Sequence, residues 1–276
     1  MIMWPDRKRF AVTLSFDLDA ETAWDTSSLD GRRLTLLSMG AYCRRVGVPR
    51  ILELLARHDI RAQFYIPARV AEMDPNVVRG IADAGHGIGC HGYFHERTDE
   101  QTPAQNRQIL EDSKRLLERT IGREVNHYRA PTWEITPDVV EALVELGFKS
   151  DSSLMGDDRP YLVGGEPGQL LELPVSWVLD DWEQFAYSAE PAMGGVIETP
   201  DKVFELWRAE VDGMRAYGGH FMLTMHPQLI GRPSRMLMLE RLIEYIKGFD
   251  DAWWCTPDDV HGQWRSGALD LPLYPY

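Results

Sequence analysis

The feature that most constrains the fold of this chain is a repeated alternation of short apolar runs with longer helical patterns. The apolar runs are rich in strand-forming residues and lie at 10–16, 60–66, 86–91, 126–130, 147–150, 219–225 and 252–255. Apolar residues recur at helical spacing between them, at 50–57, 75–84, 102–119, 137–146, 200–217 and 234–247. This alternation is typical of parallel βα units. The sequence therefore predicts an α/β fold with seven or eight such units, the size of one βα barrel.

The length of 276 residues fits a single barrel domain over 1–276, and no repeat, low-complexity tract or linker divides the chain. The stretch 151–195 is rich in Gly, Pro, Asp and Trp, and predicts a long loop region over one face with one short strand at 170–174. The three cysteines are widely spaced and lack the C-x-x-C pattern of a zinc knuckle or a redox pair. We expect reduced, buried thiols, as in a cytoplasmic protein.

The net charge of −14 excludes several classes of partner. A strongly acidic surface repels nucleic acid and anionic membranes. The N-terminal residues lack the apolar segment and cleavage site of a secretory signal, and no apolar run approaches the ~18 residues of a membrane span. We therefore expect a soluble cytoplasmic protein with no nucleic-acid or membrane partner.

Polar residues with metal-binding or acid–base chemistry follow the predicted strands at the point where each strand ends. In a βα barrel the carboxyl ends of all strands meet at one rim, so residues far apart in the sequence come together there. We expect one cleft at this rim that contains Asp17, Asp19, His91, Arg129, Asp151 and His226.

Asp17 and Asp19 point to the same side of an extended strand because they are two residues apart. One carboxylate of such a pair can bind a metal ion while the other accepts a proton from water. The alternative is a pair of solvated strand-end aspartates that form caps or turns. Phe16 and Trp24 on either side favour a walled pocket over this alternative.

His91 and His95 have the i, i+4 spacing at which two imidazoles can reach one ion. Gly92 allows the backbone to turn after the strand, and Glu96 could fix the tautomer of a histidine. Two ordinary histidines, one buried and one exposed, are the alternative. With Asp19, the pair predicts a site for one divalent metal ion with open positions for water and substrate. Zinc is the metal that we expect, and manganese, cobalt, nickel or iron also suit such ligands.

Arg129 and His226 complete the predicted cleft. The guanidinium of Arg129 could hold the carboxylate of Asp17 in a bidentate ion pair, or form an ordinary surface ion pair. His226 follows an almost wholly apolar run, and an imidazole suits the role of a general acid for a leaving nitrogen. A hydrogen-bonded core histidine is the alternative.

Residues near these side chains are candidates for substrate binding. Trp24 and Trp133 could line the cleft, and Arg232 could bring a positive charge to an anionic substrate. Trp177 and Trp182 could cover the cleft, but packing of the long loop region is the interpretation that we favour for them. The candidate substrate-binding residues are Glu21, Trp24, Trp133, Asp151 and Arg232.

These motifs, taken in order from Phe10 to the C-terminus, resemble those of the polysaccharide deacetylase family (carbohydrate esterase family 4). The resemblance covers most of the chain. It implies a single-domain distorted (β/α)7-8 barrel and metal-assisted hydrolysis of an N-acetyl group or a related amide. The roles that it implies are base for Asp17, metal ligand for Asp19, His91 and His95, orientation of the base for Arg129, and acid for His226.

The first motif departs from the usual family pattern. The family has adjacent aspartates followed by glycine, whereas here Leu18 separates the two aspartates and Ala20-Glu21 follows. Together with the H-P-x-x-x-G-R-P pattern at 226–233, this variant is similar to a branch of allantoinase-like, cyclic-imidase-like and unusual peptidoglycan-deacetylase-like proteins. The resemblance to this branch implies an intracellular homo-oligomer, often a tetramer.

The sequence predicts a metal-dependent hydrolase of carbon–nitrogen amide bonds that acts on a small amide, an imide or an N-acetyl sugar. The missing export signal favours a small molecule over a cell-wall polymer. A catalytically silent barrel that binds a sugar or a metabolite is the alternative. The presence of all the functional positions argues against it.

Overall fold

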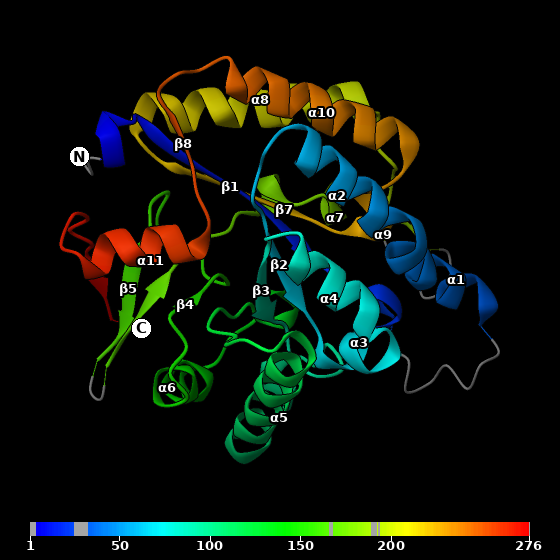
Figure 1. The fold of residues 1–276 in the computed structure, drawn as a ribbon, viewed down its shortest axis with the longest axis vertical. Coiled ribbons are helices and arrows are strands. Elements are labelled where there is room, and N and C mark those ends of the chain that lie inside the picture. Colours follow the sequence, from blue (N-terminus) through cyan, green and yellow to red (C-terminus); the bar gives the residue numbers. More distant parts are fainter. Residues whose placement is uncertain (1–3, 25–32, 166–167, 189–191, 193, 276) are drawn as a thin grey trace.

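The computed structural model describes residues 4–24, 33–165, 168–188, 192 and 194–275. Its described part is a mixed α/β fold in which helices surround two β-sheets (Figure 1). The α/β prediction is therefore confirmed. The prediction of one domain over 1–276 includes residues outside the described ranges and stays a prediction.

The first sheet contains five strands, four of which follow the order β3-β2-β1-β7, while β8 pairs with the first residues of β1. Every pair in this sheet is parallel. All eight residues of β1 are buried, which explains its almost continuous apolar sequence. The bounds are β1 Phe10–Asp17, β2 Gln63–Ile66, β3 Gly87–Cys90, β7 His220–Met225 and β8 Ala252–Trp254.

The second sheet has the order β4-β6-β5-β9, with bounds β4 Ser150–Asp151, β5 Tyr161–Gly164, β6 Gln169–Glu172 and β9 Leu273–Tyr274. Single bridges continue the hydrogen bonding around the molecule, between Cys90 and Tyr128, His127 and Ser150, and Asp180 and Thr224. Within the described residues, the strands thus follow the path of a barrel. Single bridges, rather than regular strand pairing, join the two sheets. The segment predicted as a strand at 126–130 is one of these bridged stretches, because it pairs with each neighbour at a single position.

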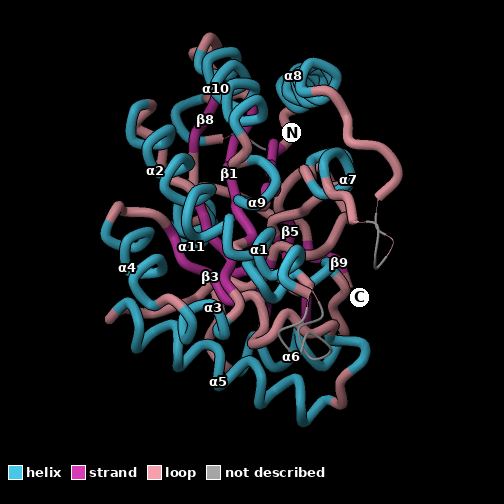
Figure 2. Tube along the Cα trace, turned by 90° about the vertical axis from the view of Figure 1, so that its right-hand side faces the viewer, coloured by secondary structure: helices cyan, strands magenta, loops and turns pink. Residues whose placement is uncertain are grey.

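Helices cover the strands from outside, and α8 and α10 pack together at one end of the molecule (Figure 1). α5 packs against α3, α4 and α6 at the opposite end, and Figure 2 shows the same separation after a quarter turn. None of the described helices is long and apolar enough to cross a membrane. The bounds are α1 Leu34–Tyr42, α2 Val48–Arg57, α3 Ala68–Met73, α4 Pro75–Asp83, α5 Pro103–Ile121, α6 Pro137–Glu145, α7 Trp182–Phe185, α8 Pro200–Tyr217, α9 Pro227–Ile230, α10 Pro233–Lys247 and α11 Pro257–Arg265.

Local sequence signals set the ends of the long helices. Thr102 and Thr256 form capping boxes that begin α5 and α11, each with proline at the next position. Gly122 and Gly218 end α5 and α8 in the left-handed conformation that glycine adopts without strain. Of these helices, α5 and α8 agree with the sequence patterns, whereas α1 and α3 were not predicted. In the described part of 151–195, β6 confirms the expected short strand, and β5 beside it was not predicted.

Candidate active site

Three side chains with metal-binding chemistry converge at the carboxyl ends of β1 and β3. Asp19 lies two residues after β1, and His91 directly follows β3. Oδ1 of Asp19 lies 3.6 Å from Nε2 of His91 and 3.8 Å from Nε2 of His95. These distances are too long for hydrogen bonds. Two ligands of a tetrahedral zinc ion, each ~2.1 Å from it, are about 3.4 Å apart, so the spacing fits one cation.

The environment of Asp19 also fits a cation. Its Oδ1 atom is buried and has no hydrogen-bond partner among the described residues. A buried carboxylate oxygen without a partner is costly unless a donor or a cation meets it. Burial raises the pKa of Asp19 to about 7, although the charge of His226 acts in the opposite direction. A cation between the three ligands would favour the ionised carboxylate.

Both histidines are held in the neutral form that binds metals. Nδ1 of His91 donates a hydrogen bond of 2.7 Å to the carbonyl oxygen of Arg129, which leaves Nε2 free to act as a ligand. Glu96, the residue expected in this role, instead accepts a hydrogen bond from a backbone N–H of its own turn. Burial lowers the pKa of His91 and lowers that of His95 to about 3.

The turn that carries His95 into the site has an unusual backbone. Gly92 and His95 both have positive φ, at 72° and 68°. A Cβ atom at Gly92 would lie 3.0 Å from Oε2 of Glu96 and 3.2 Å from the ring of Pro131. Glycine therefore suits position 92, because it adopts this φ without strain and because a Cβ atom would crowd both neighbours.

Arg129 is fully buried and fixes Asp17. Its Nη1 atom donates hydrogen bonds to Oδ1 of Asp17 at 2.7 Å and to Oγ of Ser15 at 3.1 Å. Its Nε and Nη2 atoms donate to the carbonyl oxygen and Oγ of Ser152. Arg129 therefore contacts one oxygen of Asp17, and not both as expected for a bidentate pair. The other oxygen faces Nε2 of His91 at 3.9 Å.

The charge of Asp17 is stabilised by this arrangement. Burial raises the pKa of Asp17, but the positive charges of Arg129 and His226 act against burial, and the pKa lies below its ordinary value. Asp17 is thus an ionised carboxylate with one fixed oxygen. Its other oxygen faces the candidate metal-binding group, which consists of Asp19, His91 and His95.

A buried carboxyl pair lies next to Arg129. Asp151, at the end of β4, is in register with Glu172, the last residue of β6. Oδ1 of Asp151 and Oε1 of Glu172 accept hydrogen bonds from the segment 152–154, which also holds the guanidinium of Arg129. Burial raises the pKa of both carboxyl groups. Oδ2 of Asp151 and Oε2 of Glu172 are buried and have no other hydrogen-bond partner among the described residues, so one shared proton would keep the two acids compatible in a dry environment.

His226 directly follows β7 and faces the metal-binding group from the opposite side. Its Nε2 atom lies 3.7 Å from Oδ2 of Asp19. Its Nδ1 and its backbone N–H both donate to Oδ1 of Asp181, at 2.7 and 2.9 Å, and Oδ1 of Asp180 lies 3.5 Å from Nδ1. Burial lowers the pKa of His226, but Asp180 and Asp181 raise it well above its ordinary value. The imidazole is thus a fixed cation whose Nε2 proton points into the site.

These side chains form one wall of a cavity of about 280 Å³. Tryptophans form much of the rest of the cavity wall. The rings of Trp133 and Trp177 contact each other with centroids 4.5 Å apart, and the ring of Trp182 contacts the ring of His226. Trp133 lies where it was expected, and Trp177 and Trp182 line the cavity in addition to packing the loop region. The described residues that line the cavity are Asp17, Asp19, Ala23, His91, His95, Thr132, Trp133, Trp177, Asp180, Trp182, Glu183 and His226.

Two of the predicted substrate-binding residues, Glu21 and Trp24, lie outside the cavity because the chain turns sharply after Asp19. Ala20 has a φ of 51° and begins the short helix η2, Ala20–Ala23. This turn carries Glu21 into an ion pair with Arg44. Trp24 is buried behind the cavity wall, where its ring lies 5.9 Å from that of Trp182.

The other two residues lie behind the site or beside it. Asp151 belongs to the buried carboxyl pair and acts on the site only through the segment that holds Arg129. Arg232 stacks on the ring of Tyr42 at 3.7 Å instead of facing the cavity. Of the candidate substrate-binding residues, the structure thus brings Trp133 to the cavity and leaves Glu21, Trp24, Asp151 and Arg232 outside it.

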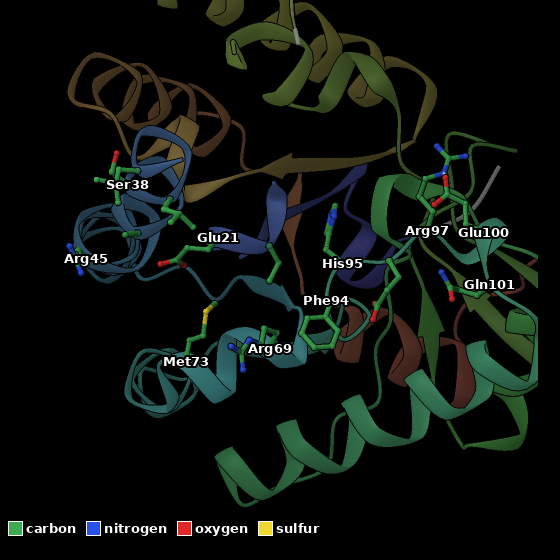
Figure 3. A pocket seen from close by; sticks show the side chains of 15 residues that line it. Glu21, Ser38, Arg45, Arg69, Met73, Phe94, His95, Arg97, Glu100 and Gln101 are labelled. Atoms are coloured by element: carbon green, nitrogen blue, oxygen red, sulfur yellow. The ribbon is translucent and has the colours of Figure 1, made fainter. Parts of the chain in front are cut away.

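A wider groove of about 1340 Å³ opens beside the cavity, and His95 lines both (Figure 3). Arg45, Arg69 and Arg97 line the groove, and Figure 3 shows Arg45 and Arg97 on opposite sides of it. In the described part of the chain, no lysine or arginine lines the cavity itself. Positive side chains are therefore available to a molecule in the groove but not to one in the cavity.

The cavity residues that come from the irregular stretch after β6 were not predicted from the sequence. Asp180, Asp181 and Glu183 lie around the start of α7, without a strand that would place them at the rim. The one available signal was the pair of adjacent carboxylates followed by Trp182, since paired acids beside a large aromatic residue are typical of a desolvated site.

Comparisons with known proteins agree with this geometry. The sequence profile of the polysaccharide deacetylases matches residues 39–150. The chain is 28% identical to the peptidoglycan deacetylase of Helicobacter pylori, over 92% of this chain and 95% of the relative. A crystal structure from Mycobacterium smegmatis, assigned to the polysaccharide deacetylases, shares 40% identity and a TM-score of 0.93 over 97% of this chain and 94% of the other.

A second crystal structure, that of Puue allantoinase, has a TM-score of 0.84 and 25% identity over 95% of this chain and 92% of the other. These relatives confirm the predicted fold type, the (β/α)7-8 barrel of polysaccharide deacetylases. The identity and the coverage are high enough to decide the family. This chain belongs to the polysaccharide deacetylase family.

Proposed function

We propose that this protein is a metal-dependent hydrolase of carbon–nitrogen amide bonds. The observation that carries the proposal is the unpartnered Oδ1 atom of Asp19, which faces Nε2 of His91 and Nε2 of His95 beside the carboxylate of Asp17. One carboxylate and two imidazoles can hold a divalent cation and leave further positions open. Zinc suits this set best, and manganese, cobalt, nickel and iron share its ligand types. When bound, the cation would polarise the carbonyl group of the amide and acidify a water molecule.

Asp17 acts as the base in this proposal. Arg129 fixes one carboxylate oxygen and favours the ionised form, so the other oxygen is available to accept a proton from the attacking water. Arg129 is itself held by Ser15 and Ser152, which prevents the base from turning away from the water. The attack on the carbonyl carbon is therefore assisted by a base with a single orientation.

His226 acts as the acid. Asp181 accepts the Nδ1 proton of His226, so the proton on Nε2 is the one that points into the cavity. The raised pKa of His226 ensures that this proton is present at neutral pH. Transfer of the proton to the departing nitrogen produces a neutral amine and completes the cleavage of the C–N bond.

The cavity supports a small substrate: a small amide, an imide or an N-acetyl compound. Its volume of about 280 Å³ is at the lower end for ligand sites, which begin at about 300 Å³. One relative is named for peptidoglycan and another for allantoin, so the names leave both a polymer and a small ring open. We favour the small molecule because three tryptophans surround the space in front of the ligands.

Metal analysis and a substrate panel test the proposal. Protein loaded with zinc, manganese or cobalt is assayed against N-acetylglucosamine, allantoin, hydantoin and succinimide, and bound metal is measured by mass spectrometry. We expect one ion per chain and hydrolysis of at least one compound, with both lost in His91→Ala. Full activity of a metal-free preparation would contradict the mechanism. Tight binding of one compound without hydrolysis in any metal form would favour a silent binding protein.

We also propose that the protein works in the cytoplasm as a homo-oligomer, without nucleic-acid or membrane partners. The net charge of −14 supports the expected lack of nucleic-acid and membrane partners, because it repels polyanions. All three cysteines are buried and free, which suits a reducing compartment.

A further inference from the structure

The charges around the cavity are distributed unevenly. The wall with the metal-binding residues faces a second group of acids near the start of α7, Asp180 and Glu183. Neither carboxylate is paired with a lysine or an arginine of the described chain, and His226 is the cationic group close to them. A molecule in the cavity therefore meets two further carboxyl groups beyond the metal-binding group, and no lysine or arginine of the described lining.

The two acids differ in their exposure to water. Asp180 is buried, and burial raises its pKa, whereas Glu183 is exposed to solvent and lines the cavity. Oδ1 of Asp180 already accepts a hydrogen bond from the backbone N–H of Trp182 at 2.8 Å. A cation or an N–H donor next to Asp180 would favour the ionised carboxylate, and water competes little for it at this buried position.

The neighbouring walls are aromatic. Trp133, Trp177 and Trp182 line the same cavity as the two acids. Tryptophan attracts a cation placed over its ring, and aromatic cages combined with carboxylates are a common means of binding ammonium groups. The described lining offers no guanidinium or ammonium group that would bind a carboxylate.

The cavity relates the two acids to the departing half of the substrate. Asp180 and Glu183 line it together with His226, the side chain assigned to protonate the leaving nitrogen. We infer, on the basis of the proposed amide hydrolysis, that the cavity selects amides whose leaving amine carries a second positively charged or N–H-bearing group, which Asp180 and Glu183 bind between the tryptophans. Amides with a carboxylate at that place are rejected by charge repulsion.

Three acetamides with the same four-carbon spacer test the inference on zinc-loaded protein. N-acetylputrescine ends in an ammonium group, N-pentylacetamide in a methyl group and 5-acetamidopentanoate in a carboxylate. We expect kcat/KM to decrease in this order, by about tenfold at each step, the effect of one hydrogen bond to a charged group. Equal values for the three compounds, or a preference for the carboxylate, would overturn the inference.

Glu183→Gln separates the charge from the shape of the cavity. The glutamine keeps the size of the side chain, and we expect the ratio of kcat/KM for N-acetylputrescine to that for N-pentylacetamide to fall about tenfold. Asp180→Asn provides a second variant with the same expected direction. Glu244→Gln, at an exposed position of α10, is the control and should leave the ratio unchanged. An unchanged ratio in both cavity variants counts against the inference.

Calorimetry makes the test independent of turnover. Binding of the three compounds is measured with and without zinc, in the unaltered protein and in Glu183→Gln. Tighter binding of N-acetylputrescine that weakens in Glu183→Gln supports the inference even if no compound is hydrolysed, a result that would count against the proposed hydrolysis alone. Equal affinities in the unaltered protein overturn the inference even if all three are hydrolysed.

Discussion

Asp17 has two oxygens with different surroundings, and this difference determines what a substitution there can reveal. One oxygen accepts a hydrogen bond from Arg129, whereas the other faces the metal-binding group. In Asp17→Asn the amide oxygen can still accept the bond from Arg129, but the side chain can no longer accept a proton. We expect kcat to fall about 10²–10⁴-fold while bound metal stays unchanged.

Steady-state kinetics and metal analysis of the same preparation check this prediction. Asp201→Asn, at a 92% exposed side chain on α8, is the matched control and should keep full activity. A near-normal kcat in Asp17→Asn would show that another group removes the proton.

Single site residues could be predicted from the sequence where they end a strand or directly follow one. Asp17, Asp19 and His91 end or follow strands whose burial the apolar runs predicted, so the rule that strand ends meet at one rim was sufficient. Asp181 lies in a stretch without a regular strand, and its partner His226 is distant in sequence. A hydrogen bond between such segments depends on the assembled fold, which no local pattern encodes.

At the scale of elements, we expect Asp151 at the end of β4 and Glu172 at the end of β6 to share one proton. Oε1 of Glu172 accepts two backbone hydrogen bonds, from Ser153 and Leu154. Glu172→Gln keeps this acceptor, and its amide can donate to Asp151, so we expect the free energy of unfolding to change little. Glu172→Leu leaves two buried N–H groups and one acid without partners, at a cost of roughly 1–3 kcal/mol for each N–H group.

Urea denaturation measures both variants. Similar destabilisation by the glutamine and leucine substitutions would mean that Glu172 is ionised in the native protein and that the pair shares no proton. Glu205→Leu, at an exposed position of α8, controls for the general effect of a surface leucine.

An ion-pair cluster at the start of α11 makes a pH-dependent contribution to stability. Asp258 lies 3.2 Å from Nε2 of His127 and 3.0 Å from Nζ of Lys149. The close contact with His127, and to a lesser extent Lys149, holds the pKa of Asp258 well below its ordinary value, although burial acts in the opposite direction. A carboxyl group with a lowered pKa contributes stability above its ordinary pKa and loses it as the pH falls below that value.

We therefore expect Asp258→Asn to lower the free energy of unfolding by about 0.5–1 kcal/mol at pH 7, a modest value because the side chain is partly exposed. The difference from the unaltered protein should be the same at pH 5 and should shrink at pH 3. Urea midpoints at the three pH values measure it. A difference that persists undiminished at pH 3 would exclude the ionised carboxylate as its source.

Strands and helices with strong periodic patterns were predictable, but the connections that shape the barrel were not. The long capped helices α5 and α8 and the buried strands β1 and β7 agree with the sequence patterns. The segment 126–130 is held by single bridges to two neighbours, and β5 and β9 pair only because distant parts of the chain meet. Such pairings depend on tertiary contacts rather than on local preference.

At the scale of the whole molecule, the homo-oligomer suggested by the family branch stays a prediction. A tetramer would have four times the chain mass of 31.6 kDa. Size-exclusion chromatography with light scattering should give a multiple of the chain mass that does not change on dilution in the micromolar range. A mass of a single chain would contradict the prediction.

A bound metal ion would link parts of the molecule that are far apart in the sequence. Asp19 follows β1, whereas His91 and His95 follow β3, so the unfolded chain does not bring the ligands together. An ion that binds the native state alone adds about 2.7 kcal/mol at a free concentration 100 times its Kd. For a chain of this size we expect zinc to raise the Tm of chelator-treated protein by about 5–10 °C.

Differential scanning fluorimetry with and without zinc checks this expectation. The shift should disappear in His91→Ala, because two of the three ligands cannot hold the ion tightly, and it should remain in His261→Ala, whose position in α11 is away from the site. An equal shift in His91→Ala would mean that the stabilising ion binds elsewhere. The absence of any shift in the unaltered protein would mean that the spacing of the three ligand atoms, although suitable, does not produce a binding site for zinc.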